Sequence, residues 1–161
     1  GGPEEELSSL TRFLSSLKEK IEFDSLIYGV IASRYQKSRL DRMCEKIGIS
    51  PITPLWGRDP ISLLKEIVSS GFKTIIVSVS ALGLDERWLG RLIDERAIEE
   101  IVELHRKYGI HPCFEGGEAE TFVLDCPLFE KSIEIVRYSV VKENLSAYLV
   151  IEEARLRQKY G

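Results

Sequence analysis

Two adjacent glycines and three glutamates occupy one short segment, Glu115-Gly116-Gly117-Glu118-Ala119-Glu120-Thr121, between two apolar runs. Glycine lets the backbone adopt positive φ angles and approach a ligand closely. Carboxylates crowded into a turn repel one another unless a cation or a set of backbone N–H groups lies among them. The segment is therefore a candidate site for a cationic group. A solvated acidic turn is the alternative that this pattern alone leaves open.

A second candidate site is cationic. Four basic residues occupy the turn and the first helical turns after a predicted buried strand: Arg34, Lys37, Arg39 and Arg42. A helix N-terminus already favours anions, and cationic side chains beside it would complete a phosphate-sized site. Tyr35 and Gln36 add an aromatic ring and an amide, which suit a base or another planar group. The alternative is a solvated basic helix face.

Two further segments contribute candidates. Trp56 and Arg58 precede a predicted helix cap at Asp59. Arginine suits bidentate recognition of a carboxylate or phosphate, whereas a tryptophan also suits a core position. Residues 81–90 form a long loop without periodicity, as functional loops often do. This loop and the residues after it offer Gly83, Asp85, Gly90 and Asp94. Asp94, like Asp59, has a structural alternative as a helix N-cap.

Several other kinds of site find no support in the sequence. It has no GxSxG nucleophile motif and no Walker phosphate loop, and neither of its two histidines has an obvious catalytic partner. The three cysteines are widely spaced, which argues against a structural metal and favours free thiols in a reducing cytosol. No apolar stretch reaches the roughly 18 residues of a membrane span, and the start lacks a signal-peptide pattern. We therefore expect a soluble, cytoplasmic protein with no membrane partner.

The composition is that of a globular protein. The 161 residues are 43% hydrophobic and 30% charged, which fits one domain, or one domain and part of another, without disorder. The formal net charge of -4 argues against a generally basic surface. Nucleic acid is therefore not expected as a partner.

Helices and strands alternate in the predicted pattern, which is typical of an α/β layered fold. Apolar periodicity and capping residues predict helices at 7–21, up to Gly48, from Asp59 to Gly71 and from about Asp94 to Gly109. Strands are predicted at 25–31, 72–80, 110–114, 121–124, 132–141 and 147–153, with 51–58 as an extended crossing and 142–146 as a hairpin connection. The loops 33–39, 81–90 and 115–121 follow strand ends. Ligands of open α/β sheets bind at the carboxyl ends of strands.

Five motifs follow one another along the chain: Ser33-Arg34-Tyr35-Gln36-Lys37-Ser38-Arg39, Leu55-Trp56-Gly57-Arg58-Asp59, Ala81-Leu82-Gly83-Leu84-Asp85 with Leu89-Gly90, Glu115-Gly116-Gly117-Glu118-Ala119-Glu120-Thr121-Phe122-Val123-Leu124-Asp125, and Pro127-Leu128-Phe129. Over about residues 5–153 they resemble the diphthine–ammonia ligase family, the N-type ATP pyrophosphatases of the PP-loop superfamily. The resemblance implies that residues 1–50 end a HUP-like, parallel-sheet ATP-binding α/β domain. It also implies that residues 51–161 form a smaller, mixed α/β substrate-side domain.

The resemblance further implies an ATP-dependent amide ligase with Mg²⁺ as a cofactor. Such enzymes adenylate the carboxylate of diphthine, a modified histidine on elongation factor 2, and ammonia then displaces AMP to give diphthamide. If cationic residues contact the anionic groups of the ligands, Arg34, Lys37 and Arg39 would lie near phosphate or the adenylated substrate. The glutamates 115, 118 and 120 would be the catalytic residues, positioning a cationic group, ammonium or Mg²⁺. The expected substrate- or nucleotide-contacting residues are Ser33, Arg34, Tyr35, Gln36, Lys37, Arg39, Trp56, Arg58, Gly83, Asp85, Gly90, Asp94, Gly116, Gly117 and Thr121.

One family motif is missing. The family binds ATP through a Ser-Gly-Gly-x-Asp-Ser loop after its first strand, and this sequence contains no such loop. The chain thus resembles the later half to two-thirds of the family, with ATP and Mg²⁺ held mainly by the absent segment, and we expect it to be inactive alone. A truncated parallel sheet leaves edge strands and apolar surface uncovered, so a homo-oligomer or a complementing PP-loop half is expected.

Two other functions remain open from the sequence. One is a non-catalytic module that binds elongation factor 2 or another protein without turning over ATP. The other is a PP-loop ATP pyrophosphatase that acts on another carboxylate or on a tRNA base, although the negative net charge counts against tRNA.

Overall fold

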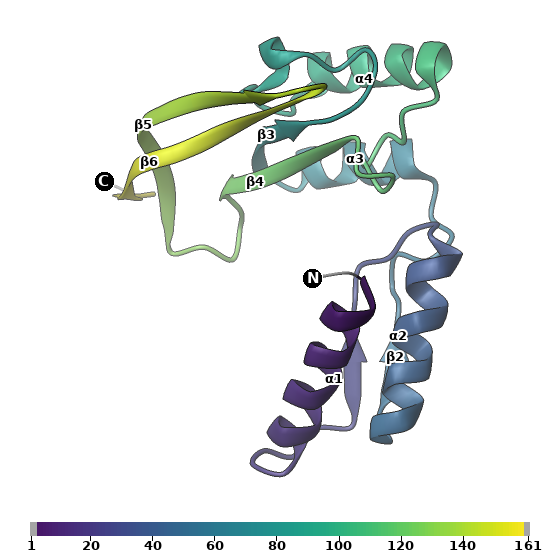
Figure 1. The fold of residues 1–161 in the computed structure, drawn as a ribbon. Coiled ribbons are helices and arrows are strands. Elements are labelled where there is room, and N and C mark those ends of the chain that lie inside the picture. The colour runs from purple at the N-terminus through teal and green to yellow at the C-terminus, as the bar shows by residue number, and fades with distance from the viewer. Residues whose placement is uncertain (1–2, 160–161) are drawn as a thin grey trace. The chain divides into compact units, whose positions relative to one another are not determined.

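The computed structural model describes residues 3–159. The backbone divides after Arg58 into two compact units, here called unit 1 (Gly1–Arg58) and unit 2 (Asp59–Gly161). The sequence-based boundary lies earlier, ahead of the crossing segment 51–58. Within the described residues, unit 1 contains a parallel pair of strands and unit 2 a four-stranded antiparallel sheet, so the prediction of an α/β fold is confirmed (Figure 1).

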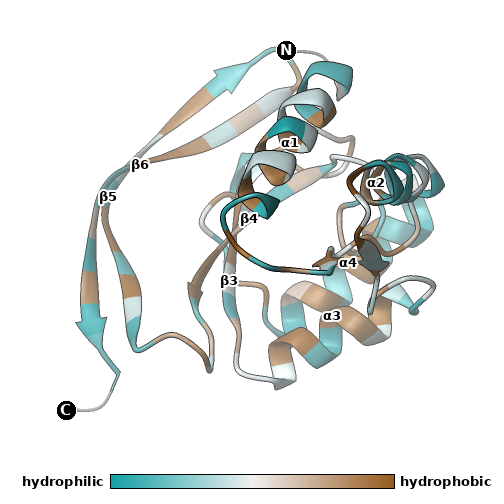
Figure 2. Ribbon diagram, turned by 90° about the horizontal axis from the view of Figure 1, so that it is seen from below, coloured by the Kyte–Doolittle hydropathy of each residue, from teal (hydrophilic) through white to brown (hydrophobic). Residues whose placement is uncertain are grey.

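Unit 1 consists of helix α1 (Pro3–Lys18), strand β1 (Ser25–Ile27), helix α2 (Arg34–Ile47) and strand β2 (Ser50–Ile52). Hydrophobic and hydrophilic residues alternate in bands along α1 (Figure 2), as expected of a helix with one apolar face. The side chains of Leu14, Met43, Cys44 and Ile49 form a small buried core. The Lys18 ammonium donates to the Ile47 and Gly48 carbonyl oxygens, at 3.0 and 2.7 Å, and so ties the end of α1 to the end of α2.

Local sequence accounts for the bounds of α2. The Ser33 hydroxyl accepts a hydrogen bond from the Gln36 N–H, which caps the first turn. At the other end Gly48 adopts φ 74°, the left-handed conformation that glycine favours at a helix C-terminus. The predicted helix end at Gly48 is confirmed.

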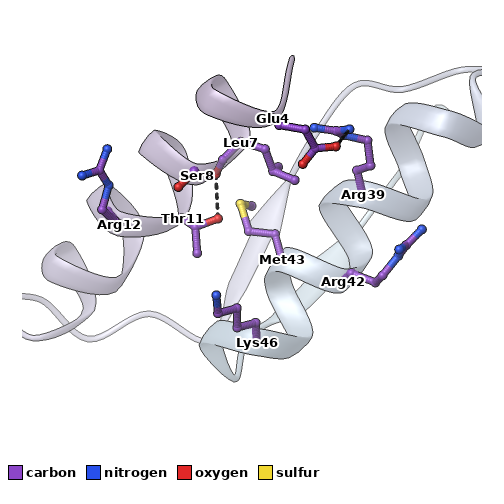
Figure 3. A pocket seen from close by; sticks show the side chains of 9 residues that line it. All are labelled: Glu4, Leu7, Ser8, Thr11, Arg12, Arg39, Arg42, Met43 and Lys46. Atoms are coloured by element: carbon purple, nitrogen blue, oxygen red, sulfur yellow. Dashed lines mark hydrogen bonds and ion pairs between the residues drawn. The ribbon is translucent and has the colours of Figure 1, made fainter. Parts of the chain in front are cut away.

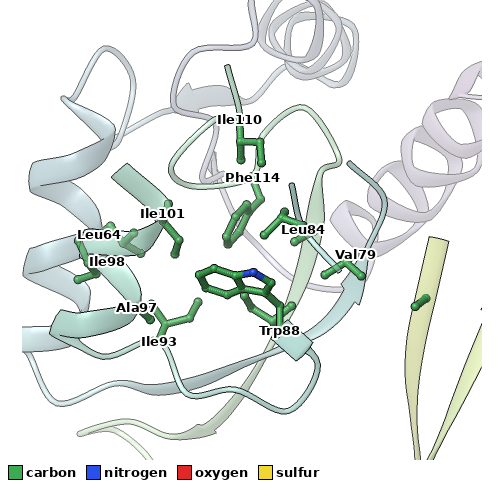
Figure 4. Close-up of a cluster of buried hydrophobic side chains, with 13 residues drawn as sticks. Leu64, Val79, Leu84, Trp88, Ile93, Ala97, Ile98, Ile101, Ile110 and Phe114 are labelled. Atoms are coloured by element: carbon green, nitrogen blue, oxygen red, sulfur yellow. The ribbon is translucent and has the colours of Figure 1, made fainter. Parts of the chain in front are cut away.

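Unit 2 contains helix α3 (Pro60–Ser69), strand β3 (Lys73–Val79), the single 3₁₀ turn η1 (Glu86–Trp88) and helix α4 (Glu95–Tyr108). Strands β4 (Ala119–Asp125), β5 (Lys131–Glu143) and β6 (Ser146–Gln158) follow. The strand order is β4-β3-β6-β5, and each neighbouring pair is antiparallel. Figure 4 shows the core, in which Trp88 and Phe114 lie among aliphatic side chains of the two helices. Ile76 of β3 and Ile101 of α4 are fully buried there.

Strands β5 and β6 form a long hairpin that projects from the body of unit 2 (Figure 1). Hydrophobic and hydrophilic residues alternate along both strands (Figure 2), the period expected of strands with two unlike faces. The connection is the tight turn at Asn144, whose φ is 54°, so both strands are longer than predicted.

Three further sequence-based elements are wrong in type or length. No strand forms at 110–114, because Pro112 has no N–H and the His111 ring captures the Cys113 and Glu115 N–H groups that a ladder would use. Helix α1 ends at Lys18 rather than at Ile21. Strand β1 ends at Ile27, although the Tyr28 N–H still donates to the Ile52 carbonyl oxygen at 3.1 Å.

The relation between the three loops also differs from the expectation. Residues 115–121 lead into the amino end of β4, not out of a strand, and β4 runs antiparallel to β3. The acidic segment nevertheless lies at the carboxyl end of β3, because the Ser80 N–H donates to the Glu118 carbonyl oxygen at 2.8 Å. Among the described residues, no helix is long and apolar enough to cross a membrane.

Candidate functional site

Unit 1 contains a cavity of about 640 Å³ beside the end of β1 and the first turns of α2. This volume lies in the range of small-molecule sites. Four of its lining residues were predicted from the sequence: Ser33, Tyr35, Gln36 and Arg39. The rest of the wall consists of Tyr28, the carboxylate of Glu6, Gly29 and four aliphatic residues, Leu7, Leu10, Val30 and Leu40. The mixture suits a planar organic group with a polar or charged edge.

Arg39 is held by two neighbours. Its guanidinium forms an ion pair with Glu4 of α1 and donates to the Tyr35 hydroxyl at 2.6 Å. The guanidinium carbon also lies 4.9 Å from the centre of the Tyr35 ring, within cation–π range. The Arg39 side chain is only 12% exposed, whereas Tyr35 is 61% exposed. Arg39 is thus pre-positioned at the cavity wall, and Tyr35 presents a ring on which a planar group could stack.

Two other predicted residues, Lys37 and Trp56, belong to a polar network that includes Tyr28 of the cavity wall. The Tyr28 hydroxyl donates to one Asp41 oxygen, and the Lys37 ammonium donates to the other at 2.7 Å. Lys37 also lies 5.6 Å from the centre of the Trp56 ring. The Lys37 and Tyr28 hydrogen bonds hold the pKa of Asp41 below its ordinary value, and burial together with Asp41 raises that of Tyr28. The network therefore fixes Asp41 as a carboxylate and Tyr28 as a neutral donor.

The acidic turn of unit 2 is built around one of its three glutamates. Glu118 folds back so that its Oε1 accepts the His111 N–H at 2.8 Å, while Oε2 is buried without a hydrogen-bond partner among the described residues. A Cβ at Gly116 would lie 2.7 Å from Glu118 Oε1, so glycine is needed there for the carboxylate to occupy this place. Gly117 has φ 81° and completes the turn.

The residues around this turn are arranged by the His111 ring. Its Nδ1 accepts from the Cys113 N–H at 3.2 Å and the Glu115 N–H at 3.5 Å, which leaves Nε2 as the protonated nitrogen of the neutral ring. The Cys113 thiol donates to the Pro60 carbonyl oxygen at 3.3 Å, and burial raises its pKa to about 11. A thiol held in the neutral form does not suit a nucleophile.

The other two glutamates differ from Glu118. Glu115 is half-buried, and Glu120 and Thr121 are exposed on β4, where Glu120 pairs with Ser78 of β3. In the described part of the chain, no group of three histidine, cysteine or acidic side chains could hold a metal ion. The residues present therefore do not fit a Mg²⁺ ion held by the three glutamates together.

The remaining predicted residues of unit 2 have structural contacts. Asp94 caps α4 through the Ala97 N–H, and Asp85 caps η1 through the Arg87 N–H while pairing with the Arg87 guanidinium at 2.7 Å. This pairing lowers the pKa of Asp85. Gly83 has φ 96° against the Tyr108 ring. The Gly90 N–H donates to the Ile76 carbonyl oxygen at 2.8 Å.

The structure does not bring all the predicted residues of unit 1 to the cavity wall. Arg34 is exposed on the first turn of α2 and Arg58 is half-buried at the end of the unit, and neither lines the cavity. The sequence reasoning also missed Glu6, Tyr28 and Asp41. The spacing of Lys37 and Asp41, four residues apart on a predicted helix, was a usable signal for their ion pair.

The sequence matches two parts of one known family. Residues 1–51 match the diphthamide synthase N-terminal domain, and residues 59–156 match the diphthamide synthase C-terminal domain. These two matches fall on either side of the division between unit 1 and unit 2. The cavity and the acidic turn therefore lie in different domains of the family.

Named relatives extend this similarity. The chain is 39% identical over 153 residues to the diphthine–ammonia ligase of mouse, covering 94% of this chain and 57% of the relative. The human diphthine–ammonia ligase is 39% identical over 152 residues, with the same coverage. That of Saccharomyces cerevisiae is 32% identical over 157 residues, covering 84% of this chain and 23% of the relative. The chain thus spans little more than half the length of the mammalian relatives that it matches, and it belongs to the diphthamide synthase family.

Proposed function

We propose that this chain is part of an ATP-dependent ligase that converts diphthine on elongation factor 2 into diphthamide. The observation that carries the proposal is the similarity, along both units, to proteins named diphthine–ammonia ligase. The cavity of unit 1 supports it, because residues of the Ser33–Arg39 motif surround a space of small-molecule size.

The proposed reaction has two steps. The diphthine carboxylate attacks the α-phosphorus of ATP, which releases pyrophosphate and leaves an acyl-adenylate. Ammonia then attacks the acyl carbon, the C–O bond to AMP breaks, and the proton lost by nitrogen passes to a base. The first step requires the carboxylate in its anionic form, the second requires neutral ammonia, and both require an environment that stabilises developing negative charge.

In this scheme the cavity of unit 1 receives the planar part of the nucleotide or of the modified histidine. Tyr35 offers a stacking surface, and Arg39 offers a fixed guanidinium for an anionic oxygen. In the Tyr28–Asp41–Lys37 network, each Asp41 oxygen accepts one hydrogen bond, and these bonds hold the three side chains in place. The acidic turn, with the buried Glu118 carboxylate, is the proposed receptor of a cationic group or of ammonia.

The proposal includes a further α/β segment with the phosphate loop. Strands β1 and β2 form a two-stranded parallel sheet, and parallel sheets are normally covered on both faces and extended at their edges. Ile27 of β1 is 68% exposed and Phe13 of α1 is 62% exposed. These apolar side chains suit packing against such a segment. We propose that the chain alone is inactive and acts with it in the cytoplasm, where free cysteines such as the three of this chain stay reduced.

The test is an amidation assay with the chain and a separately produced segment of the mouse relative, the part of that relative that this chain does not match. Diphthine-modified elongation factor 2, ATP, Mg²⁺ and ammonia are supplied, and AMP release and the mass of the modified histidine are followed. We expect AMP and diphthamide only when all components are present. Arg39→Gln should lower the rate at least about tenfold, as the loss of a charge-assisted contact does, whereas Lys20→Gln should not.

The intact mouse enzyme serves as the positive control. If it forms diphthamide under these conditions while the combined halves release no AMP, the ligase proposal for this chain is wrong. If AMP release depends on another carboxylate or on tRNA, and not on elongation factor 2, that compound and not elongation factor 2 is the substrate.

A further inference from the structure

A second cavity in unit 1 lies between helices α1 and α2, next to the larger one. It has a volume of about 320 Å³ and shares Leu7 and Arg39 with its neighbour. Figure 3 shows Met43 and Thr11 facing each other across it, and Lys46 extending into the space between the helices. Met43 is 3% exposed and belongs to the small core, so the floor of the cavity is fixed.

The wall of this cavity is strongly cationic. Arg12 comes from α1, and Arg42 and Lys46 come from α2, where they are four residues apart. In Figure 3 the exposed side chains of Arg12 and Arg42 lie at the two outer edges of the cavity and extend away from each other. Glu4 is the single carboxylate among the described lining residues, and it is already paired with Arg39. No described carboxylate forms an ion pair with the other three cations.

The few contacts of these cations do not neutralise them. Arg12 donates to the Ser9 hydroxyl at 3.4 Å, and Arg42 donates to the Ser38 carbonyl oxygen at 3.2 Å. Two helix faces that meet usually carry complementary charges, because like charges repel across the gap. Here both faces are basic around a concave surface, within a chain whose net charge is -4. Such an arrangement concentrates positive potential where an anion can enter.

We propose that this cavity is a binding site for a phosphate-type anion, held by Lys46, Arg42 and Arg12. It is separate from the neighbouring cavity, which lacks these three cations. The Ser8 hydroxyl lines the same space and can donate to a phosphate oxygen, whereas the Thr11 hydroxyl already donates to the Leu7 carbonyl oxygen at 2.7 Å. Only the choice of pyrophosphate as the probe rests on the proposed ligase function.

Glu4 should act as a competitor for the anion. Its carboxylate adds a negative charge at one end of the cavity and occupies the Arg39 guanidinium. Glu4→Gln removes this negative charge from the end of the cavity. We expect this variant to bind pyrophosphate about threefold more tightly, an effect of the size of an exposed ion pair.

The loss experiment uses a matched pair of variants of the whole chain. Lys46→Gln and Lys20→Gln each remove one lysine charge from unit 1, but Lys20 does not line the cavity. Inorganic pyrophosphate is titrated into each chain by calorimetry at fixed, low salt. We expect Lys46→Gln to weaken binding about tenfold, since a charge-assisted hydrogen bond is lost, and Lys20→Gln to leave it unchanged. Circular dichroism checks that both variants are folded.

ATP, titrated in parallel, distinguishes two sources of the anion. If Tyr35→Ala weakens ATP binding but not pyrophosphate binding, the site takes the phosphates of a nucleotide whose base lies in the neighbouring cavity. If Tyr35→Ala changes neither, the site takes a free anion. Both results support the site, whereas equal affinities of the Lys46→Gln and Lys20→Gln chains for both ligands would overturn it. Absence of binding to the folded chain at millimolar concentrations would also overturn it.

These measurements need no ligase activity. If the chain binds pyrophosphate through Lys46 but releases no AMP in the combined assay, the anion site is supported and the proposed ligase function is wrong. If AMP is released but pyrophosphate binding does not depend on Lys46, only the proposal of the anion site is wrong.

Discussion

At the scale of single residues, Glu118 is the most constrained acidic side chain of the conspicuous sequence motif. One of its oxygens is hydrogen-bonded to a backbone N–H, the other is buried, and the adjacent glycine leaves the space that the carboxylate fills. An unpaired buried oxygen costs free energy unless a ligand satisfies it. The motif therefore combines the positioned carboxylate of Glu118 with a half-buried one at Glu115 and an exposed one at Glu120.

Replacing Gly116 by alanine should displace the Glu118 carboxylate, because the new Cβ would lie 2.7 Å from Oε1 and 2.9 Å from Cδ. We expect the free energy of unfolding in urea to fall by about 1–3 kcal/mol as the His111 hydrogen bond is lost. Gly29→Ala is a suitable control, since its Cβ would meet its nearest neighbour at 3.7 Å and its φ is not in the left-handed region.

The cause can be isolated with a second substitution. In a Glu118→Ala background the clash is absent, so Gly116→Ala should have almost no further effect on stability. An equal cost of Gly116→Ala in both backgrounds would show that another contact is responsible.

Asp41 provides a prediction about pH. Its pKa lies below the ordinary 3.8 because Lys37 and Tyr28 donate to it, so the carboxylate stabilises the folded chain above pH 3.8 and this stabilisation is lost as the pH falls through the lowered pKa. Asp41→Asn should cost about 1 kcal/mol at pH 7, a modest value because the group is partly solvated. Urea unfolding at pH 7, 5 and 3 should show the difference from wild type shrinking at the lowest pH. A difference that stays constant would rule out the charge as its origin.

At the scale of elements, the helices of this chain are defined by their caps. Ser33, Asp59 and Asp94 each accept a hydrogen bond from a backbone N–H of the first turn of α2, α3 and α4, respectively. Gly48 and Gly109 end α2 and α4 in the left-handed conformation. The structural alternatives weighed for Asp59 and Asp94 are thus the ones that the structure displays, and any binding role of Asp94 remains a prediction.

The two roles of Asp94 can be separated with serine. Asp94→Ala should lower the free energy of unfolding by about 1 kcal/mol because the Ala97 N–H loses its acceptor. Asp94→Ser should recover most of this loss, since serine is a good N-cap. Urea unfolding of both variants measures the effect. If serine does not restore stability, the carboxylate itself, and not the cap, is required.

At the scale of the whole molecule, residues 3–159 contain two hydrophobic cores. The small one of unit 1 lies between α1 and α2, and the larger one of unit 2 lies among β3, α3 and α4. Among the described residues the two core clusters share no member. Each unit should therefore have its own local stability.

Core substitutions should act on one unit at a time. Ile101→Ala should lower the stability of unit 2 by about 2–5 kcal/mol, because this side chain is fully buried in the larger core. Met43→Ala should act in the same way on unit 1. Hydrogen exchange followed by mass spectrometry, peptide by peptide, measures the two units separately. Loss of protection in both units after either substitution would show that they unfold together.

Much of the secondary structure of this protein could be predicted from local sequence features. The sequence alone predicted α2, α3 and α4 closely, because a helix is defined by contacts and caps within a few residues of each other. It also predicted the α/β class, and the five motifs were enough to recognise the family. Its account of which residues contact a ligand stays a prediction.

Only the tertiary structure decided what depends on distant residues. Tyr148 pairs with Ser78 across seventy positions of the chain, and no local pattern specifies such a register. The predicted strand at 110–114 failed for a local reason instead, because the His111 ring accepts the Cys113 and Glu115 N–H groups, two and four residues along the chain. The antiparallel pairing of β3 and β4 then placed the acidic turn at the end of β3, and helix packing brought Arg12 opposite Arg42 and Lys46. The strand register, the β3–β4 pairing and the helix packing share one physical reason: they consist of contacts between segments distant in the sequence, which form only after the chain has folded.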